Sequence, residues 1–366
     1  MQIDFHHAVT YVVARLAGFP HDEAHIIAYS AQYVDDATND GYIEFDTGAL
    51  YSRIASAHKM LDYKNFNDLA NHHAWIPFHF LPGNNGLPAG QGNDLGFIQR
   101  IICKPNSYVA RDMVAECIQR KKDRNALHRL GITMHVYADT WAHQGFVGVE
   151  HKINRASELS SNHAGLASAS MTDSIKRYFS GLFDHAKGEL VADALPLGHG
   201  AVLSYPDRPY LNWTYTNGEG KVVKRNNPAD FLDAADHMCI AMKSFIAGDP
   251  SLSTTGLAAD DKKKIDKLIR ETVNEDGDIR HATWLKAIKK GDFSFGKSDV
   301  NYVAKGLNSW KHAALNTIET EDTGNENFTY HPNFLNSDWK KFHDALQMHR
   351  LYVVQELLPG YGICAA

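Results

Sequence analysis

Apolar residues recur at helical spacing over most of the chain, which predicts a mainly α protein. Residues 5–17 (FHHAVTYVVARLA) predict a first helix that ends at Gly18. A second helix opens at His21-Asp22, and a third is expected from near Thr47 with Leu50, Ile54 and Ala57 on one face. Further helices are predicted over residues 105–121, 123–143, 155–192, 229–246, 258–274, 281–290 and 336–358.

Two segments depart from this pattern. Residues 82–94 (PGNNGLPAGQGND) are dense in Gly, Pro and Asn and predict a loop. Residues 193–228 hold too many turn formers for a helix, and WTYTNGEGKVVK predicts a small β-hairpin near 213–224. A weak boundary at 248–256 predicts a helical catalytic domain over 1–247. The remainder, 248–366, would then be a mainly helical extension that packs on this core or docks to a membrane.

Composition narrows the class of protein. The 366 residues are 44% hydrophobic and 22% charged, and the formal net charge of −6 gives no support for a nucleic-acid surface built on bulk charge. The four cysteines form no C-x-x-C pair, so a disulfide framework or a thiolate zinc site is not expected. The 21 histidines are unusual and favour a metal site, although most of them are expected to be packing or surface residues.

The expected localisation rests on two features that the sequence does not show, a membrane span and a Sec-type signal peptide. No stretch is long and apolar enough for a membrane span, and MQIDFHHAVT has no charged segment leading into an apolar run. The expectation is therefore a cytoplasmic protein, a protein secreted by a route without a Sec-type signal, or a mature form.

The segment MHVYADTWAHQGF carries the clearest chemical pattern. His135, Asp139 and His143 recur every four residues, so successive members lie about 40° apart on one helix face. Two imidazoles flanking a carboxylate suit Zn²⁺, and the two oxygens of Asp139 could bridge two ions. The alternative is a set of hydrogen-bonded core histidines.

Other positions favour the metal interpretation. Asp35 shares the face of Ala24, Ala28 and Ala31 on the second helix, where a buried carboxylate is costly without a partner or a metal. His79 stands between two phenylalanines in WIPFHFLPG, so it is either stacked in a core or directed into a pocket. One of His6 and His7 should face the interior of the first helix.

In this order the motifs resemble the zinc phospholipase C and single-strand nuclease superfamily, trinuclear zinc phosphodiesterases with an all-helical fold. The resemblance covers roughly residues 1–210. It implies two or three Zn²⁺ ions and the metal ligands His6, Asp35 (in AQYVD), His79 (in PFHFLP), His135, Asp139, His143, His199 and Asp207.

The sequence differs from the family pattern in three places. The family's N-terminal tryptophan binds metal through its amine and carbonyl, whereas this chain begins Met1-Gln2, so Asp4 or His7 replaces that ligand or one zinc site is altered. His143 follows His135 after eight residues, where the family has about ten. His163 competes with the His199 and Asp207 pair for the third site.

The resemblance implies a zinc-dependent phospholipase C, a secreted or cytoplasmic hydrolase that degrades lipids. It would cleave the glycerol-side phosphodiester of phosphatidylcholine-like phospholipids through metal-activated water, with Asp35 orienting or deprotonating that water. The partners expected are the phospholipid and a peripheral membrane contact, and nucleic acid is less favoured because the chain is acidic. Aromatic residues that could line the cleft, or pack in the core, are Trp75, Phe78, Phe80, Tyr205, Tyr210, Trp213 and Tyr215.

Three alternatives remain open at this stage. A nuclease or other phosphodiesterase would use the same metals. A phosphohydrolase of the histidine–aspartate domain type would need an adjacent His-Asp doublet as ligands, and only His21-Asp22 and His343-Asp344 qualify. A non-catalytic helical protein could hold structural histidines or store metal.

Overall fold

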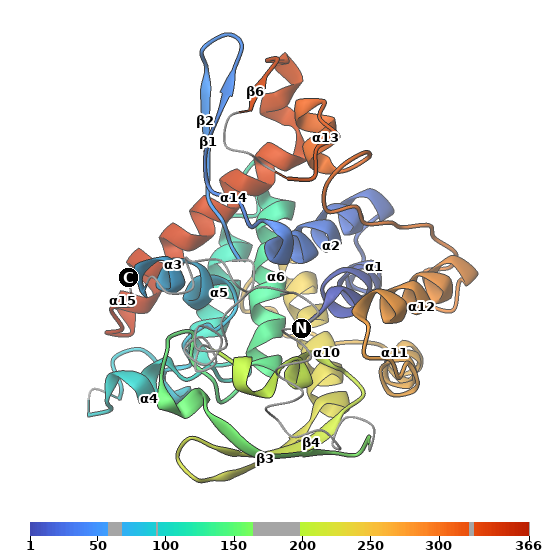
Figure 1. The fold of residues 1–366 in the computed structure, drawn as a ribbon. Helices are drawn as coiled ribbons and strands as arrows, with labels where there is room; N and C mark the ends of the chain where they lie inside the picture. Colours follow the sequence, from blue (N-terminus) through green and yellow to red (C-terminus); the bar gives the residue numbers. More distant parts are fainter. Residues whose placement is uncertain (58–67, 93, 164–197, 322–325, 366) are drawn as a thin grey trace, which may run out of the picture.

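The computed structural model describes residues 1–57, 68–92, 94–163, 198–321 and 326–365, and these form a mainly α fold with two small sheets (Figure 1). The longer α-helices are α1 (Thr10–Ala17), α2 (His21–Asp36), α3 (Asp68–Phe78), α5 (Tyr108–Gln119), α6 (Ala126–Ala142), α10 (Asn227–Ala247), α11 (Ala259–Glu271), α12 (Gly277–Lys290) and α14 (Asp338–Tyr352). Short helices are α4 (Phe97–Ile101), α13 (Trp310–Leu315) and α15 (Leu358–Gly360). Single π or 3-10 turns are η1 (Asp4–Val9), η3 (Asn84–Gly86), η4 (Lys152–Asn154), η5 (Gly200–Val202), η6 (Tyr205–Asp207), η7 (Pro332–Asn336) and η8 (Val353–Leu357).

Helix α6 is the centre of the fold. It packs against α2, α5, α10 and α14, and every residue from His128 to Ala142 is buried. Gly131 allows the closest approach, because a Cβ atom there would lie 2.3 Å from the carbonyl oxygen of Ile27 on α2. This contact fixes α2 beside the part of α6 that carries His135.

The predicted N-terminal helices are present with one modification. The first begins as the π-helical turn η1 and continues as α1, which ends at Gly18 with a left-handed φ of 115°. Helix α2 follows and ends at Asp36. The amine of Met1 contacts Asp139 on α6, so the chain's N-terminus lies near the middle of the molecule (Figure 1).

The expected third helix from Thr47 is wrong. The strands β1 (Gly41–Phe45) and β2 (Leu50–Arg53) form an antiparallel hairpin instead, and β6 (Asn327–Phe328) pairs with β1 in parallel. Gly48, with a φ of 79°, takes part in the turn that joins the hairpin strands. The helical spacing of Leu50 and Ile54 is thus coincidental.

The second sheet agrees with the predicted hairpin and extends it. Strands β4 (Asn212–Asn217) and β5 (Val222–Asn226) are antiparallel around the turn at residues 217–220. Strand β3 (Ala156–Ser161) pairs with β4, so the predicted helix over 155–192 is wrong at its start. The rest of that prediction, from residue 164, lies outside the described residues.

The elements after residue 248 pack on the same core as those before it. One buried cluster joins Phe5, Met134 and Phe231 to Ile265 and Trp284. Helix α12 contacts η1, and α14 runs along α6 (Figure 1). No helix in the described part of the chain is long and apolar enough to cross a bilayer.

Candidate metal centre

The eight residues expected as metal ligands come from six parts of the chain and meet beside α6. His6 lies on η1, Asp35 in the last turn of α2, and His79 directly after α3. His135 and Asp139 lie on α6, and His143 is the residue that caps its C-terminal end. His199 precedes η5 and Asp207 ends η6.

Three groups of these side chains could each hold a metal ion. The groups are His6, Asp35 and His135; His79, His135 and Asp139; and His143, His199 and Asp207. In each group the donor atoms lie within 4.8 Å of one another. The structure therefore brings together every ligand expected from the sequence.

The spacing of the donor atoms in the second group can be compared with that in a tetrahedral metal site. His79 Nδ1 and His135 Nε2 each lie 3.3 Å from Asp139 Oδ2, and the two nitrogens are 3.2 Å apart. Ligands bound to a tetrahedral zinc ion at 2.0–2.1 Å lie roughly 3.3 Å from one another. The three atoms thus fit three corners of such a tetrahedron.

Hydrogen bonds to the backbone decide which ring nitrogens face this centre. His135 Nδ1 lies 2.7 Å from the carbonyl oxygen of Ala31, and His79 Nε2 lies 3.1 Å from that of Ser56. Because a carbonyl oxygen only accepts, each of these nitrogens carries the proton. In its neutral form each ring then presents the lone pair of its inward nitrogen towards Asp139, an arrangement that a cation would stabilise.

The third group repeats the arrangement. His143 Nδ1 donates to the carbonyl oxygen of His79 at 2.7 Å, and His199 Nδ1 donates to that of Leu203 at 2.7 Å. Their Nε2 atoms lie 3.4 and 3.5 Å from the two oxygens of Asp207. Metal-ligating histidines commonly donate their second nitrogen in this way. His143 therefore belongs to the cluster despite its short spacing from His135.

The first group includes His6, whose ring stacks on that of His135 at 3.8 Å between centroids. His6 Nε2 lies 3.2 Å from Asp139 Oδ1, yet neither nitrogen of this fully buried ring makes a hydrogen bond within the described residues. Buried polar atoms without partners are rare, so this ring fits the role of a metal ligand.

Neither Asp4 nor His7 belongs to one of the three groups, so the geometry gives no support to either as a replacement ligand, and an altered zinc site stays a prediction. Asp4 binds the guanidinium of Arg280 on α12, and His7 Nδ1 lies 2.8 Å from His281 Nε2. The amine of Met1 reaches the cluster instead, 2.6 Å from Asp139 Oδ1 and 3.1 Å from Asp207 Oδ1.

The ionisation of the cluster follows from burial and from opposing charges. Burial by itself would lower the pKa of the Met1 ammonium, but Asp139, Asp207 and Asp35 raise it to about 11. Burial lowers the pKa of His79 to about 4, although the adjacent Asp139 carboxylate raises it. Burial raises the pKa of Asp35 to about 7, although its side chain keeps 31% exposure. A cation in the cluster would favour the ionised carboxylates.

A cavity of about 730 Å³ opens onto the cluster. Its wall includes residues that the sequence analysis missed, namely Gln32 and, from the C-terminal part of the chain, Asp276, Asp278, Tyr302 and Ala304. The described residues that line it include no lysine and no arginine. Asp36 belongs to the same wall and accepts a hydrogen bond from Tyr302 at 2.5 Å.

Several other expected residues lie away from the cavity. Of the seven aromatic residues considered, only Trp75 and Phe80 line it. Phe78 packs in one buried cluster, and Tyr205, Tyr210, Trp213 and Tyr215 pack in another. His163 contacts the ring of Tyr210 and joins none of the three groups.

The histidine–aspartate doublets also lie elsewhere. His21 contacts the hydroxyl of Tyr11, and His343 packs on Trp339. Asp344 pairs with Lys340. Neither doublet takes part in a described group that could hold a metal, so nothing in the geometry favours that alternative.

The fold and the site together define a mainly helical protein with buried histidine and carboxylate groups that could hold metal ions. The chain belongs to DUF6765, a family of unknown function, whose model matches residues 1–357. No curated protein and no solved structure matches the chain.

Proposed function

We propose that the protein is a zinc-dependent phospholipase C with a core like that of the zinc phospholipase C superfamily. It would hydrolyse the glycerol-side phosphodiester of phosphatidylcholine-like lipids. The observation that carries the proposal is the triangle of His79, His135 and Asp139, whose three inward atoms lie 3.2–3.3 Å apart. It is flanked by two further groups of ligands. Such multinuclear centres suit phosphodiester hydrolysis.

When bound, zinc ions neutralise phosphate oxygens and lower the pKa of a coordinated water. His79, His135, Asp139 and the ring of His6 would hold ions on one side of the cluster, and His143, His199 and Asp207 on the other. Asp139 would bridge, because its Oδ1 faces His6 while its Oδ2 faces His79 and His135.

Asp35 is the best placed group to orient an attacking water and to accept its proton. Of the three carboxylates in the cluster it is the most open, with 31% of its side chain exposed, against 1% for Asp139 and 10% for Asp207. It also lines the cavity in which a substrate would lie. A general base must reach the reacting water, so exposure favours Asp35 for this role.

The charge of the cavity favours a headgroup that carries a cation. Asp36, Asp276 and Asp278 line the wall in addition to the cluster carboxylates. The described lining includes no lysine or arginine, and the Met1 ammonium is paired with Asp139 and Asp207. The quaternary ammonium of choline would be attracted to these outer carboxylates and to the face of Trp75, while the metal ions would meet the phosphate. A nucleic-acid strand brings no such cation to these carboxylates, so the nuclease alternative is less favoured.

Asp139→Asn is the sharpest test of the metal assignment. The neutral amide should abolish metal loading at more than one site, because Asp139 faces two groups of ligands. Asp22→Asn, an exposed change at the other end of α2, is the matched control and should leave loading unchanged. A fully metallated and active Asp139→Asn protein would refute the bridging role.

Product analysis distinguishes the substrates. Phosphatidylcholine should yield phosphocholine and diacylglycerol, with activity lost on chelation and in Asp35→Asn. Release of nucleotides from single-stranded DNA in place of phosphocholine would support the nuclease alternative. A metal-loaded protein that hydrolyses neither substrate would leave a metal-binding protein, and a metal-free active protein would exclude all of these proposals.

A further inference from the structure

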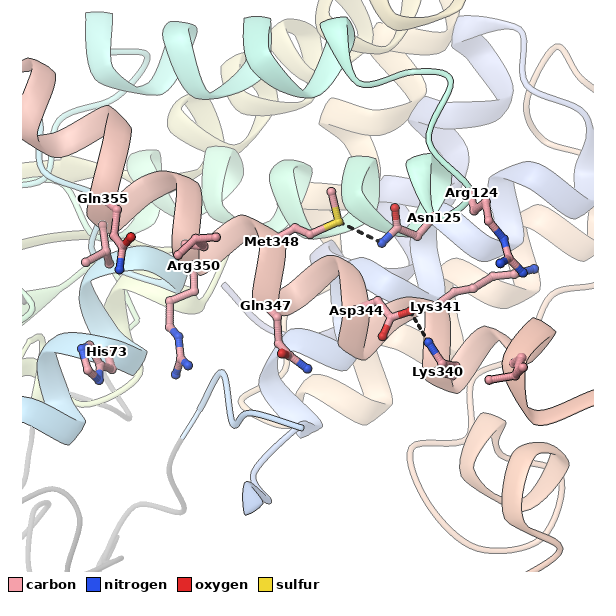
Figure 2. Close-up of a pocket in the computed structure, with 13 residues that line it drawn as sticks. His73, Arg124, Asn125, Lys340, Lys341, Asp344, Gln347, Met348, Arg350 and Gln355 are labelled. Carbon is pink, nitrogen blue, oxygen red and sulfur yellow. Dashed lines mark hydrogen bonds and ion pairs between the residues drawn. The ribbon is translucent and has the colours of Figure 1, made fainter. Parts of the chain in front are cut away.

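A second hollow of about 780 Å³ lies along the outer face of α14 and η8 and shares none of its lining residues with the metal cavity. We refer to it as the α14 groove. It also receives His73 from α3, Arg124 and Asn125 at the start of α6, and Leu335 from η7 (Figure 2). Its helical wall runs from Lys340 to Gln355, about 22 Å at the α-helical rise.

We propose that the α14 groove is a docking surface for anionic phospholipid at a membrane. The first observation is its charge. Arg124, Lys340, Lys341 and Arg350 line it against one carboxylate, Asp344, in a chain whose formal net charge is −6. A local concentration of cations on an acidic protein attracts anionic partners and so favours an anionic ligand for this groove.

Of these four cations, only Lys340 forms an ion pair within the described residues. Asp344 pairs with Lys340 at 2.5 Å, and Arg124 donates to the neutral amide oxygen of Asn336 at 2.7 Å. Within the described residues, the side chains of Lys341 and Arg350 make no hydrogen bond or ion pair, although Lys341 lies near Asp338 and Arg350 near Asp40. They stand towards opposite ends of the groove in Figure 2, so the positive charge extends along it.

The partial burial of Arg350 favours its binding of an anion. Its side chain is half-buried on the surface of α14, and this burial lowers the pKa of its guanidinium, with partial compensation from Asp40. A desolvated guanidinium gains more from a phosphate oxygen than one that is fully hydrated.

The second observation is the apolar surface between the cations. Leu335, Met348 and Leu351 line the groove with exposed fractions of 48, 36 and 54%. Large exposed apolar side chains among lysines and arginines are typical of surfaces that rest in the lipid interface. The described lining includes no Phe, Tyr or Trp side chain on which a nucleobase could stack, which disfavours a single-stranded nucleic acid.

The full-length protein can be tested by co-sedimentation with vesicles, in the presence of a chelator so that hydrolysis cannot contribute. Wild type should bind vesicles of phosphatidylcholine mixed with phosphatidylglycerol and should bind pure phosphatidylcholine vesicles weakly. Binding should fall as salt rises, because each cation near an anionic surface contributes roughly a fivefold factor that salt screens.

Two variants separate charge from apolar contact. Lys341→Glu/Arg350→Glu should reduce partitioning by at least about tenfold. Leu335→Ser/Leu351→Ser should reduce the binding that persists at high salt. Lys263→Glu, at an exposed position on α11, is the control for a charge reversal outside the groove and should bind as wild type does. Circular dichroism of each variant establishes that it is folded.

Equal binding to both kinds of vesicle, or an equal loss in Lys263→Glu, would overturn the proposal. So would high-salt binding that is unchanged in Leu335→Ser/Leu351→Ser, because lipid contact would then not involve these leucines. Release from the vesicles by inorganic phosphate at matched ionic strength would show a small-anion site and would also overturn it. These outcomes are independent of whether the metal centre is catalytic, because no turnover is measured.

Discussion

Gly131→Ala tests whether the close packing of α2 on α6 builds the metal centre. A Cβ at residue 131 would meet the carbonyl oxygen of Ile27 at 2.3 Å, Ser30 Cβ at 2.5 Å and the nitrogen of Ala31 at 3.1 Å. Two of these atoms are backbone, so α2 would have to move by about 1 Å to restore van der Waals contact. The carbonyl of Ala31, which orients His135, would move with it.

The expected cost combines two opposing effects. Alanine gains up to about 1 kcal/mol over glycine in helix propensity, whereas overpacking a core costs about 1–3 kcal/mol. Since the clash is with backbone, the upper part of that range applies, and we expect a net loss of about 1–2 kcal/mol. Disturbing the acceptor of a metal-ligating histidine typically costs another 10- to 100-fold in metal affinity.

Urea unfolding followed by circular dichroism measures the first effect, and competition with a zinc chelator measures the second. Gly360→Ala is the control, because a Cβ there meets nothing within 4 Å, and it should leave both quantities nearly unchanged. A Gly131→Ala protein as stable as wild type, with unchanged zinc affinity, would refute the argument from close packing.

Two further changes test the supports of the site. Arg280→Met should lower the free energy of unfolding by about 3–5 kcal/mol. The reason is that it leaves the buried carboxylate of Asp4 unpaired in the turn that carries His6. A loss below about 1 kcal/mol in urea unfolding would contradict this. His349→Gln tests how stability depends on pH. Burial, reinforced by Arg129, holds the pKa of His349 well below 6.5 in the folded protein. The unfolded chain therefore takes up a proton that the folded one does not as pH falls through about 6.5, which costs up to about 1.4 kcal/mol per pH unit. Unfolding free energies measured between about pH 7 and pH 5 should fall less steeply in His349→Gln, and an unchanged slope would show that this group does not contribute.

The sequence predicted elements whose signal is local. Helices α2, α6 and α10 follow from apolar periodicity, and the β4–β5 hairpin follows from its Asn-Gly turn. The sequence predicts a helix in place of the β1–β2 hairpin, because Leu50 and Ile54 have helical spacing. Strand β6, which pairs with β1 from almost 300 residues further along the chain, has no local signal. Strand β3 has the sequence ASELSS, which shows no apolar alternation. It can therefore be recognised only through its pairing with β4.

The candidate site was predictable where it depends on residue type. Histidine and aspartate side chains are visible in the sequence, so the eight residues that meet in the cluster could be named from it. The carbonyl oxygens of Ala31, Ser56 and Leu203, which fix the inward ring nitrogens, have no sequence signal. The same holds for Asp276 and Asp278, whose place in the wall depends on how α12 packs against η1.

Metal analysis of the purified full chain tests the central claim most directly. After equilibration with zinc and removal of excess ion, elemental analysis should find two or three zinc ions per chain. The chelator-treated protein should lose them, and Asp139→Asn should retain fewer. A folded chain that binds no zinc after this treatment, or whose zinc content is unaffected by Asp139→Asn, would contradict the account.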